Sequence, residues 1–291
     1  MFFINPGVTE VFVNNIKNVI FPETLKDAVS ALKKKKSFFM SSSTFSFKSV
    51  PEGTENIVLA KKLPLRYVKK DPKNLLIGAL TTFDDLENNP LCRSLFSGIL
   101  SFSASRCSSQ LIRNMATVGG NIAHPNAFNL LPVVLTALGA SVKVALRTGS
   151  KTVPVRDFYS SKFKCGTEAI ITEIQAPLSL AKDDFYFEKV SKIRSSWDSY
   201  ITVAFRSRLR NGRLEDLKLA FGAITAFPYV NEALEKELLG AELTPALIKS
   251  VSAKYGEAVL AFHPASRINA YRAELAANLT AFYLKGLTEK V

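Results

Sequence analysis

The spacing of apolar residues along the chain predicts which segments are helices. Apolar side chains such as Ala28 and Leu32 recur three or four positions apart in residues 22–36, so this segment is predicted to form an amphipathic helix. Residues 130–140, LLPVVLTALGA, are almost all apolar and predict a buried helix. Further helices are predicted in four segments: from Thr82 onwards, 95–111, about 230–260 and about 265–286.

Alternating patterns and short apolar runs predict strands. Residues 141–155 alternate around Thr148–Gly149, which is typical of a β-hairpin. Strands at about 200–209 and 214–224 flank Asn211–Gly212, a strong signal for a second hairpin. The other predicted strands are short buried runs: a segment starting at Ser37, 56–60, 74–80 and 168–177.

The order of these elements predicts an α+β fold of two domains. Mixed helices and strands come first, a hairpin-type sheet follows, and helices close the chain. The polar stretch SLAKDDF at 179–185 is the expected boundary, which gives domains at 1–178 and 185–291.

Length and composition are those of an ordinary folded protein. The 291 residues are 47% apolar and 22% charged, enough for two or three domains. No apolar run reaches the roughly 18 residues that cross a bilayer, so no membrane insertion is expected. The opening MFFINPGVTEVFVNN does not read as a signal peptide, and the cytoplasm is the expected compartment.

Cysteines and histidines are too few and too scattered for metal chemistry. Cys92, Cys107 and Cys165 form no C-x-x-C pair, which argues against an iron–sulfur cluster, a structural zinc or a disulfide framework. The two histidines are His124 and His263. No metal site is predicted, so any redox chemistry on this chain needs an organic cofactor.

The net charge of the chain indicates which kinds of partner it would bind. Thirty-eight basic and 25 acidic side chains give a formal net charge of +13, which favours anionic partners such as a phosphate-bearing cofactor or an acidic surface. The dense run Lys33–Lys36 ends the first predicted helix, where lysines complement the helix dipole. No basic motif interleaved with aromatic residues occurs, so nucleic-acid binding is not expected.

The segment IRNMATVGGNIAHP at 112–125 carries the most specific chemical signal. Gly119 and Gly120 lack a Cβ atom, so backbone N–H groups can approach an anion and φ can become positive. Thr117 and Asn121 add polar side chains before the next predicted helix. On these residues alone, a phosphate-binding loop and a tight connection that binds nothing both explain the pattern.

A wider pattern around this segment resembles a known family. IRNMATVGGNIA, a leucine-rich helix, a V-x-V hairpin and VPVRDFY together resemble the FAD-binding subunit of the molybdenum hydroxylases, the flavoproteins of xanthine dehydrogenase and carbon monoxide dehydrogenase type. The resemblance is colinear over nearly the whole chain. Its other segments are PETLKDAVSAL, LLIGALTTFDDLENNP, EAIITEIQAP, FEKVSKIRSSWDSYITVAFRSRL, LKLAFGAITAFP and PASRINAYRAELAANL.

The resemblance implies a fold and a role. Two α/β subdomains of PCMH type, dividing near residues 60–75, would hold FAD between them, and a small C-terminal domain with a three-stranded antiparallel sheet and helices would follow. The chain would be an oxidoreductase subunit that passes electrons from a partner to NAD or another acceptor. A molybdopterin-binding large subunit and a [2Fe–2S] small subunit are the implied partners. No side chain of this chain is implied as a catalytic acid or base.

The resemblance also implies which residues bind the FAD diphosphate, on two loops. The first loop matches the family's Thr-x-Gly-Gly-Asn pattern at Thr117, Val118, Gly119, Gly120 and Asn121. The second, of Ala-Gly-Gly-Thr-Asp type, aligns with Met40, Ser41, Ser42, Ser43 and Thr44.

Several of the implied cofactor-binding positions depart from the family or carry less information. Ser41 and Ser42 replace glycines; they add side chains where phosphate would approach and disfavour positive φ, although hydroxyls can donate to phosphate. Asn129, which could cap the next helix, stands where the family often has an acid. Ile170 would contact the cofactor through its backbone. Lys189 would place positive charge near the flavin, or else be a surface lysine at a strand edge.

Two hypotheses for the function follow. The first is the FAD-carrying electron-transfer subunit. The alternative is a flavin-free structural subunit that keeps the fold and docks the partner subunits, and the serine-substituted loop favours it. Flavin absorption of the purified protein discriminates between the two.

Overall fold

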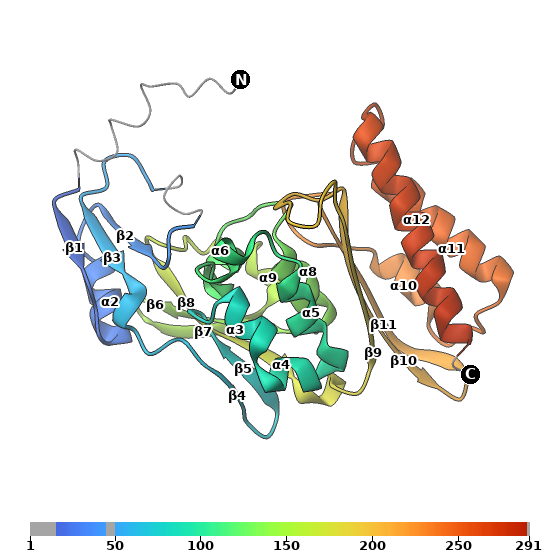
Figure 1. Ribbon diagram of the computed structural model, residues 1–291, viewed down its shortest axis with the longest axis horizontal. Helices are drawn as coiled ribbons and strands as arrows, with labels where there is room; N and C mark the ends of the chain where they lie inside the picture. Colours follow the sequence, from blue (N-terminus) through green and yellow to red (C-terminus); the bar gives the residue numbers. More distant parts are fainter. Residues whose placement is uncertain (1–15, 45–49, 290–291) are drawn as a thin grey trace.

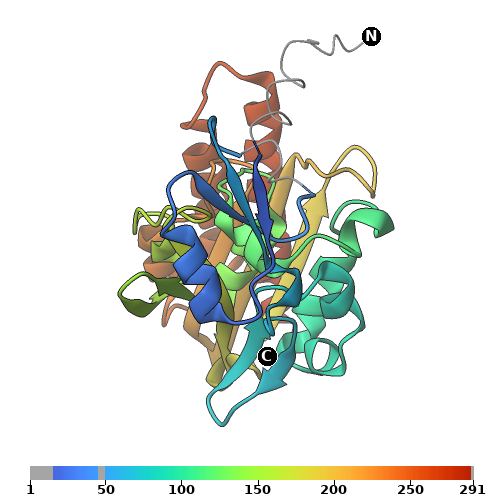
Figure 2. The same ribbon diagram turned by 90° about the vertical axis from the view of Figure 1, so that its left-hand side faces the viewer.

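The first sheet of the molecule consists of three short parallel strands. The computed structural model describes residues 16–44 and 50–289, and Figure 1 shows the described elements along the long axis of the molecule. The strand order is β1-β3-β2, and helix α2 (Leu25–Leu32), capped by Thr24, packs on β2 and β3. Figure 2 looks onto this N-terminal sheet. Its strands are β1 (Asn18–Ile20), β2 (Ser37–Met40) and β3 (Asn56–Leu59).

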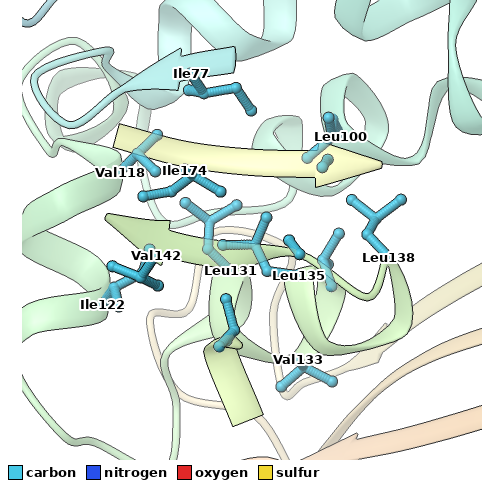
Figure 3. Packing of buried hydrophobic residues seen from close by; sticks show 14 of the residues in the cluster. Ile77, Leu100, Val118, Ile122, Leu131, Val133, Leu135, Leu138, Val142 and Ile174 are labelled. Carbon is cyan, nitrogen blue, oxygen red and sulfur yellow. The ribbon is translucent and has the colours of Figure 1, made fainter. Parts of the chain in front are cut away.

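The central sheet has five antiparallel strands in the order β4-β5-β8-β6-β7. Helix α8 (Leu130–Ala137) is buried along its whole length and forms one core with the sheet, including Ile77, Val142 and Ile174 (Figure 3). The strands are β4 (Val68–Lys70), β5 (Asn74–Gly78), β6 (Ser141–Leu146), β7 (Gly149–Pro154) and β8 (Ala169–Pro177). The other helices are α3 (Phe83–Asn88), α4 (Pro90–Ser94), α5 (Ile99–Ser105), α6 (Gln110–Arg113), α7 (Val118–Ala123) and α9 (Val155–Phe158).

The C-terminal part has an antiparallel sheet in the order β12-β11-β10-β9, covered by helices on one side (Figure 1). Asn211 and Gly212 have φ of 51° and 73°, so both central residues of this hairpin turn are left-handed, as its tight geometry requires. The strands are β9 (Asp184–Val190), β10 (Ile201–Arg210), β11 (Arg213–Gly222) and β12 (Tyr229–Val230). The helices are α10 (Glu232–Leu238), α11 (Pro245–Leu260) and α12 (Arg267–Thr288).

A buried ionic cluster joins the C-terminal sheet to the central core. Arg206 on β10 donates from Nε to the carbonyl oxygen of Ala137 at the end of α8, over 3.0 Å. Its NH1 group binds Asp183 and Asp216, each at 2.6 Å, and Arg208 binds the other oxygen of Asp183 at 2.8 Å. The guanidinium therefore ties α8 to two strands of the C-terminal sheet.

The structure confirms the α+β class and most of the predicted elements. The three long strands β9, β10 and β11 form the antiparallel sheet that the family resemblance implies, with the two-residue β12 at its edge. Two long helix predictions are wrong. The predicted helix 95–111 is interrupted where Ser97 and Ser108 have positive φ, and the predicted helix 230–260 is two helices separated by residues 239–244.

Candidate functional site

A pocket lies at the junction between the N-terminal and central sheets. The space between its walls, together with the open solvent at its mouth, amounts to about 650 Å³. Its walls come from the end of β2, the exit of β5, helix α7 and the start of β8. The lining residues are Phe38, Phe39, Met40, Ser41, Ala79, Leu80, Thr117, Gly119, Gly120, Ala123, His124, Cys165, Gly166, Ala169, Ile170 and Ile171.

The glycine pair forms the first turn of helix α7 and one wall of this pocket. Thr117 is the N-cap, and its Oγ1 accepts a hydrogen bond from the N–H of Gly120 over 3.1 Å. The N–H groups of Val118 and Gly119 donate to the carbonyl oxygens of Thr81 and Ala79, at 2.9 and 2.8 Å. Neither glycine has positive φ, so the freedom to adopt a left-handed backbone is not used here.

Close approach, rather than an unusual backbone angle, explains why glycine stands at both positions. A Cβ atom on Gly119 would lie 2.8 Å from the Cβ of Ala79 and 3.0 Å from its carbonyl oxygen. A Cβ atom on Gly120 would lie 2.9 Å from Thr117 Oγ1 and 3.4 Å from Ser41 Oγ. The pair therefore lets α7 pack directly against the exit of β5 and leaves the pocket wall bare.

The serine-substituted loop reaches across the junction to the same segment. Ser41 Oγ lies 3.1 Å from Thr117 Oγ1, and the hydroxyl of Ser42 donates to the carbonyl oxygen of Met115. Neither Ser41 nor Ser42 has positive φ, so the expected backbone conflict at these two positions does not arise. Ser43 instead has φ of 60°, in the left-handed region.

Replacing Ser43 with glycine is therefore expected to stabilise the protein. The left-handed conformation costs an L-residue about 1–2 kcal/mol, while the greater backbone freedom of glycine in the unfolded chain offsets about 0.5–1 kcal/mol of the gain. Urea denaturation of Ser43→Gly should show a free energy of unfolding raised by about 0.5–1 kcal/mol. Ser42→Gly is the control: it loses a hydrogen bond without relieving strain, so it should destabilise. A Ser43→Gly variant less stable than the parent would contradict this reading of the loop.

The remaining first-loop residues and Asn129 lie outside the pocket lining. Val118 is 1% exposed and lies in the core beside α8 (Figure 3). Asn121 Oδ1 accepts from the N–H of Leu131 over 3.3 Å, and its amide donates to Asn129 Oδ1 over 3.2 Å. Asn129 donates to the carbonyl oxygens of Asn121 and His124, at 2.7 and 2.6 Å. Asn129 stands at the N-cap position of α8, but its side chain makes no cap bond; Asn121 supplies the side-chain contact to that helix.

Ile170 and Lys189, the two candidate residues furthest along the chain from the two loops, differ in where they lie. Ile170 is 1% exposed and lines the pocket. Lys189 is buried on β9, and its ammonium donates to the carbonyl oxygens of Arg106 and Ser196. Burial lowers the pKa of Lys189 below its ordinary value. Lys189 is thus neither a pocket-lining charge nor the surface lysine of the alternative expectation.

The candidate residues therefore divide into a group at the pocket and a group away from it. Those in the lining are Met40, Ser41, Thr117, Gly119, Gly120 and Ile170. Those outside the lining are Ser42, Ser43, Thr44, Val118, Asn121, Asn129 and Lys189.

Sequence reasoning missed several lining residues, of which His124, Cys165 and Gly166 are the most informative. Burial lowers the pKa of His124 and raises the pKa of the Cys165 thiol to about 12, so both side chains are neutral at pH 7. Gly166 has φ of 91°, and a Cβ atom there would lie 2.6 Å from the ring of Phe38. A glycine just before a predicted strand was the one available signal.

Among the residues that the structure describes, no helix is both long and apolar enough to cross a membrane.

Comparisons with known proteins identify the class of this fold. Residues 14–179 match the family described as "FAD binding domain in molybdopterin dehydrogenase", and residues 186–287 match the "CO dehydrogenase flavoprotein C-terminal domain". The chain belongs to this family of FAD-binding subunits of molybdopterin-dependent dehydrogenases. It is accordingly an oxidoreductase subunit, and FAD is the cofactor of its family.

Individual relatives agree with this assignment. The medium chain of glyceraldehyde dehydrogenase from Sulfolobus acidocaldarius is 31% identical over 193 residues, which cover 65% of this chain and 67% of the relative. The FAD subunit of nicotinate dehydrogenase from Eubacterium barkeri is 28% identical over 66% of this chain and 67% of the relative. Carbon monoxide dehydrogenase from Hydrogenophaga pseudoflava has the same fold, with a TM-score of 0.81, 20% identity, and coverage of 92% of this chain and 95% of that chain.

Proposed function

We propose that this chain is the FAD-carrying electron-transfer subunit of a multi-subunit molybdenum hydroxylase. Electrons would arrive from [2Fe–2S] clusters on a small partner subunit and leave to NAD or another acceptor. A large partner subunit would hold the molybdopterin and the substrate. The observation that carries the proposal is the pocket where Ser41 of one loop and Thr117 and Gly120 of the other face each other.

The residues of this pocket fit a dinucleotide in their chemistry. Gly119 and Gly120 lie in the lining without side chains, so a phosphate would meet backbone rather than side-chain atoms at this wall. Ser41 and Thr117 supply hydroxyl groups, which can donate to phosphate oxygens. Other lining residues, such as Phe38 and Ile170, are apolar, as suits an aromatic ring system.

The proposed roles of the residues follow from this arrangement. Ser41 and Thr117 would bind the diphosphate through their hydroxyls, and Gly120 would keep the phosphate path open. Asn121 and Asn129 would position the segment between α7 and α8 through the two hydrogen bonds between them. Lys189 receives no role at the cofactor, because its ammonium is bonded to two carbonyl groups.

The pocket itself is electrically neutral. His124 and Cys165 are the ionisable side chains in its lining, and burial keeps both uncharged at pH 7. Hydroxyl groups would therefore carry the local contacts to the diphosphate, while the net charge of +13 attracts it over longer range. When bound, FAD supplies the capacity to accept and release electrons; this chain binds and orients it and shields it from water.

We also propose that the chain works as two domains, 1–178 and 185–291. The central strand β8 ends at Pro177 and the first C-terminal strand begins at Asp184, with a short turn between them. The first domain would hold the cofactor. The second would contact the first through Lys189 and Arg206, whose side chains donate to the carbonyl oxygens of Arg106 and Ala137.

Cofactor titration of the full chain tests the proposed function. Purified protein should quench the fluorescence of added FAD and retain flavin absorption through gel filtration. The bound flavin, reduced with dithionite without oxygen, should regain its oxidised spectrum when the true acceptor, such as NAD, is added. Colourless protein that refuses added FAD, yet still binds its partner subunits, would instead establish the flavin-free structural role.

A further inference from the structure

The end of helix α2 carries a run of lysines that is only partly balanced by acidic side chains. Lys33, Lys34 and Lys35 directly follow the helix, and all three are exposed. The next lysine, Lys36, differs from them because its ammonium pairs with Glu55 at 2.5 Å. Among the described residues, none of the other three lysines forms an ion pair with a carboxylate. Three uncompensated positive charges are therefore consecutive in the chain.

An arginine from the central sheet joins these lysines. Arg147 is exposed at the turn between β6 and β7, and its guanidinium donates to the carbonyl oxygen of Leu32, the last residue of α2, over 3.3 Å. The two carbonyl groups before it accept backbone N–H groups of the following residues, at 3.1 and 3.2 Å. The last three carbonyl groups of the helix therefore have donors, so capping does not explain the lysine side chains. We call Lys33, Lys34, Lys35 and Arg147 the basic patch.

The basic patch is connected to the candidate pocket through two strands. Strand β2 follows the lysines, and its residue Phe38 lines the pocket. Lys35 and Phe38 are three residues apart, which is at most about 11 Å of extended chain. Arg147 follows Leu146 of β6, whose cross-strand partner Ala169 also lines the pocket. A protein bound to the patch would therefore lie close to the pocket.

The composition of this region favours an acidic protein as the partner of the basic patch. Residues 16–63 contain nine lysines and four acidic residues, so the patch belongs to a predominantly positive region. Such a surface attracts negatively charged proteins over long range and orients them on approach. A single-stranded nucleic acid is a poorer fit, because its bases stack on aromatic side chains, and neither 26–37 nor 145–151 contains one.

We propose that the basic patch is the docking surface for an acidic one-electron carrier protein, which takes up the electrons of the flavin. The three lysines pair with carboxylates of the carrier and hold it beside the pocket. Each carrier accepts one electron, so two carriers oxidise one FADH₂ to FAD, and two protons are released to water. This inference rests on the proposed function, because it assumes that reduced FAD occupies the pocket. It names the class of acceptor that the proposed function leaves open.

Two haem proteins of opposite charge test this docking surface: cytochrome b5, which is acidic, and cytochrome c, which is basic. The full chain is loaded with FAD, reduced with dithionite without oxygen, freed of excess dithionite and mixed with either oxidised cytochrome. The rate constant for reduction of cytochrome b5 should fall steeply as salt is added, because salt screens the attraction between opposite charges. The rate constant for cytochrome c should not fall.

Two triple variants locate the effect on the surface. The patch variant combines Lys33→Gln, Lys34→Gln and Lys35→Gln. It should lower the rate constant for cytochrome b5 about tenfold at low salt, because three exposed ion pairs each contribute a factor of about two. The control variant removes the same charge from α10, α11 and α12, at the opposite end of the molecule (Figure 1), and should stay within about twofold. It combines Lys236→Gln, Lys249→Gln and Lys285→Gln.

Binding of cytochrome b5, measured by calorimetry on the chain without FAD, gives a readout that does not depend on the flavin. Its Kd should rise about tenfold in the patch variant and not in the control variant. Equal losses in the two variants would overturn the docking proposal, as would a single-stranded oligonucleotide that binds the three lysines more tightly than cytochrome b5 does. A chain that binds no FAD, yet binds cytochrome b5 through the patch, would contradict the proposed function alone, so the two failures are distinguishable.

Discussion

Gly119→Ala is expected to weaken FAD binding about 100-fold and to lower the free energy of unfolding by about 2 kcal/mol. The new methyl group would lie 2.8 Å from the Cβ of Ala79 and 3.0 Å from its carbonyl oxygen, so helix α7 must move away from β5. That movement lengthens the hydrogen bond from the N–H of Gly119 to the carbonyl oxygen of Ala79, now 2.8 Å. It also displaces Thr117 and Gly120 together. Loss of the two proposed phosphate contacts, of Thr117 and of its partner Ser41, at about 1.4 kcal/mol each gives the factor of 100.

A matched control for Gly119→Ala exists within the same chain. Gly286 lies inside helix α12, and a Cβ atom there would meet nothing within 4 Å. Gly286→Ala should therefore raise the free energy of unfolding by about 0.5–1 kcal/mol through helix propensity alone, with FAD affinity unchanged. Fluorescence titration and urea denaturation measure both quantities. A Gly119→Ala variant as stable and as tight-binding as Gly286→Ala would refute the close-approach explanation.

Arg206→Leu should cause the largest loss of stability, about 3–5 kcal/mol. The guanidinium is 6% exposed and is bonded to Asp183, which is 3% exposed, so the substitution removes one of the partners of a buried carboxylate. It also leaves the carbonyl oxygen of Ala137 without its donor from Arg206. Chemical denaturation at pH 7 should show the loss directly. A loss below about 1 kcal/mol would mean that the cluster contributes little to joining the C-terminal sheet to the central core.

Arg208→Leu is the control for the same carboxylate. Arg208 is 37% exposed and also binds Asp183, so its removal should cost about 1 kcal/mol or less.

The pH dependence of the Arg206→Leu effect adds a second check. Burial acts to raise the pKa of Asp216, but the hydrogen bond from Arg206 holds it below its ordinary value. This contribution is complete above the unfolded pKa of about 3.9 and is lost as pH falls through the folded pKa, so the Arg206→Leu effect should shrink in acid.

Local sequence rules predicted the elements whose determinants lie within a few residues. The helix predicted from Thr82 onwards is α3, and Thr82 and Asp85, which have capping-box spacing in the sequence, form both reciprocal bonds at its start. Asn211–Gly212 forms the predicted hairpin turn because both residues tolerate positive φ. The helix predicted at 95–111 failed because Ser97 and Ser108 adopt left-handed backbone angles, which serine does not signal. The three-residue strands β1 and β4 are too short for any alternation to be visible.

The candidate site was only partly predictable, because its geometry depends on contacts distant in the chain. The glycine pair was identified, but whether it served a turn or a close approach was decided by Ala79, about 40 positions earlier. The serines at 41 and 42 were expected to oppose positive φ, whereas the structure places that angle at Ser43. Lys189 can be buried because its ammonium donates to the carbonyl groups of Arg106 and Ser196. No periodic pattern in the sequence reveals these partners.

The serine loop has a consequence for how this protein evolves. A backbone N–H group survives nearly every substitution at its own position, so a site built from amides is buffered against point mutation. A hydroxyl is lost by a single codon change at Ser41 or Thr117. Under the roles proposed for Ser41 and Thr117, affinity for the flavin nucleotide therefore depends on two individual side chains, and one genetic step can change it.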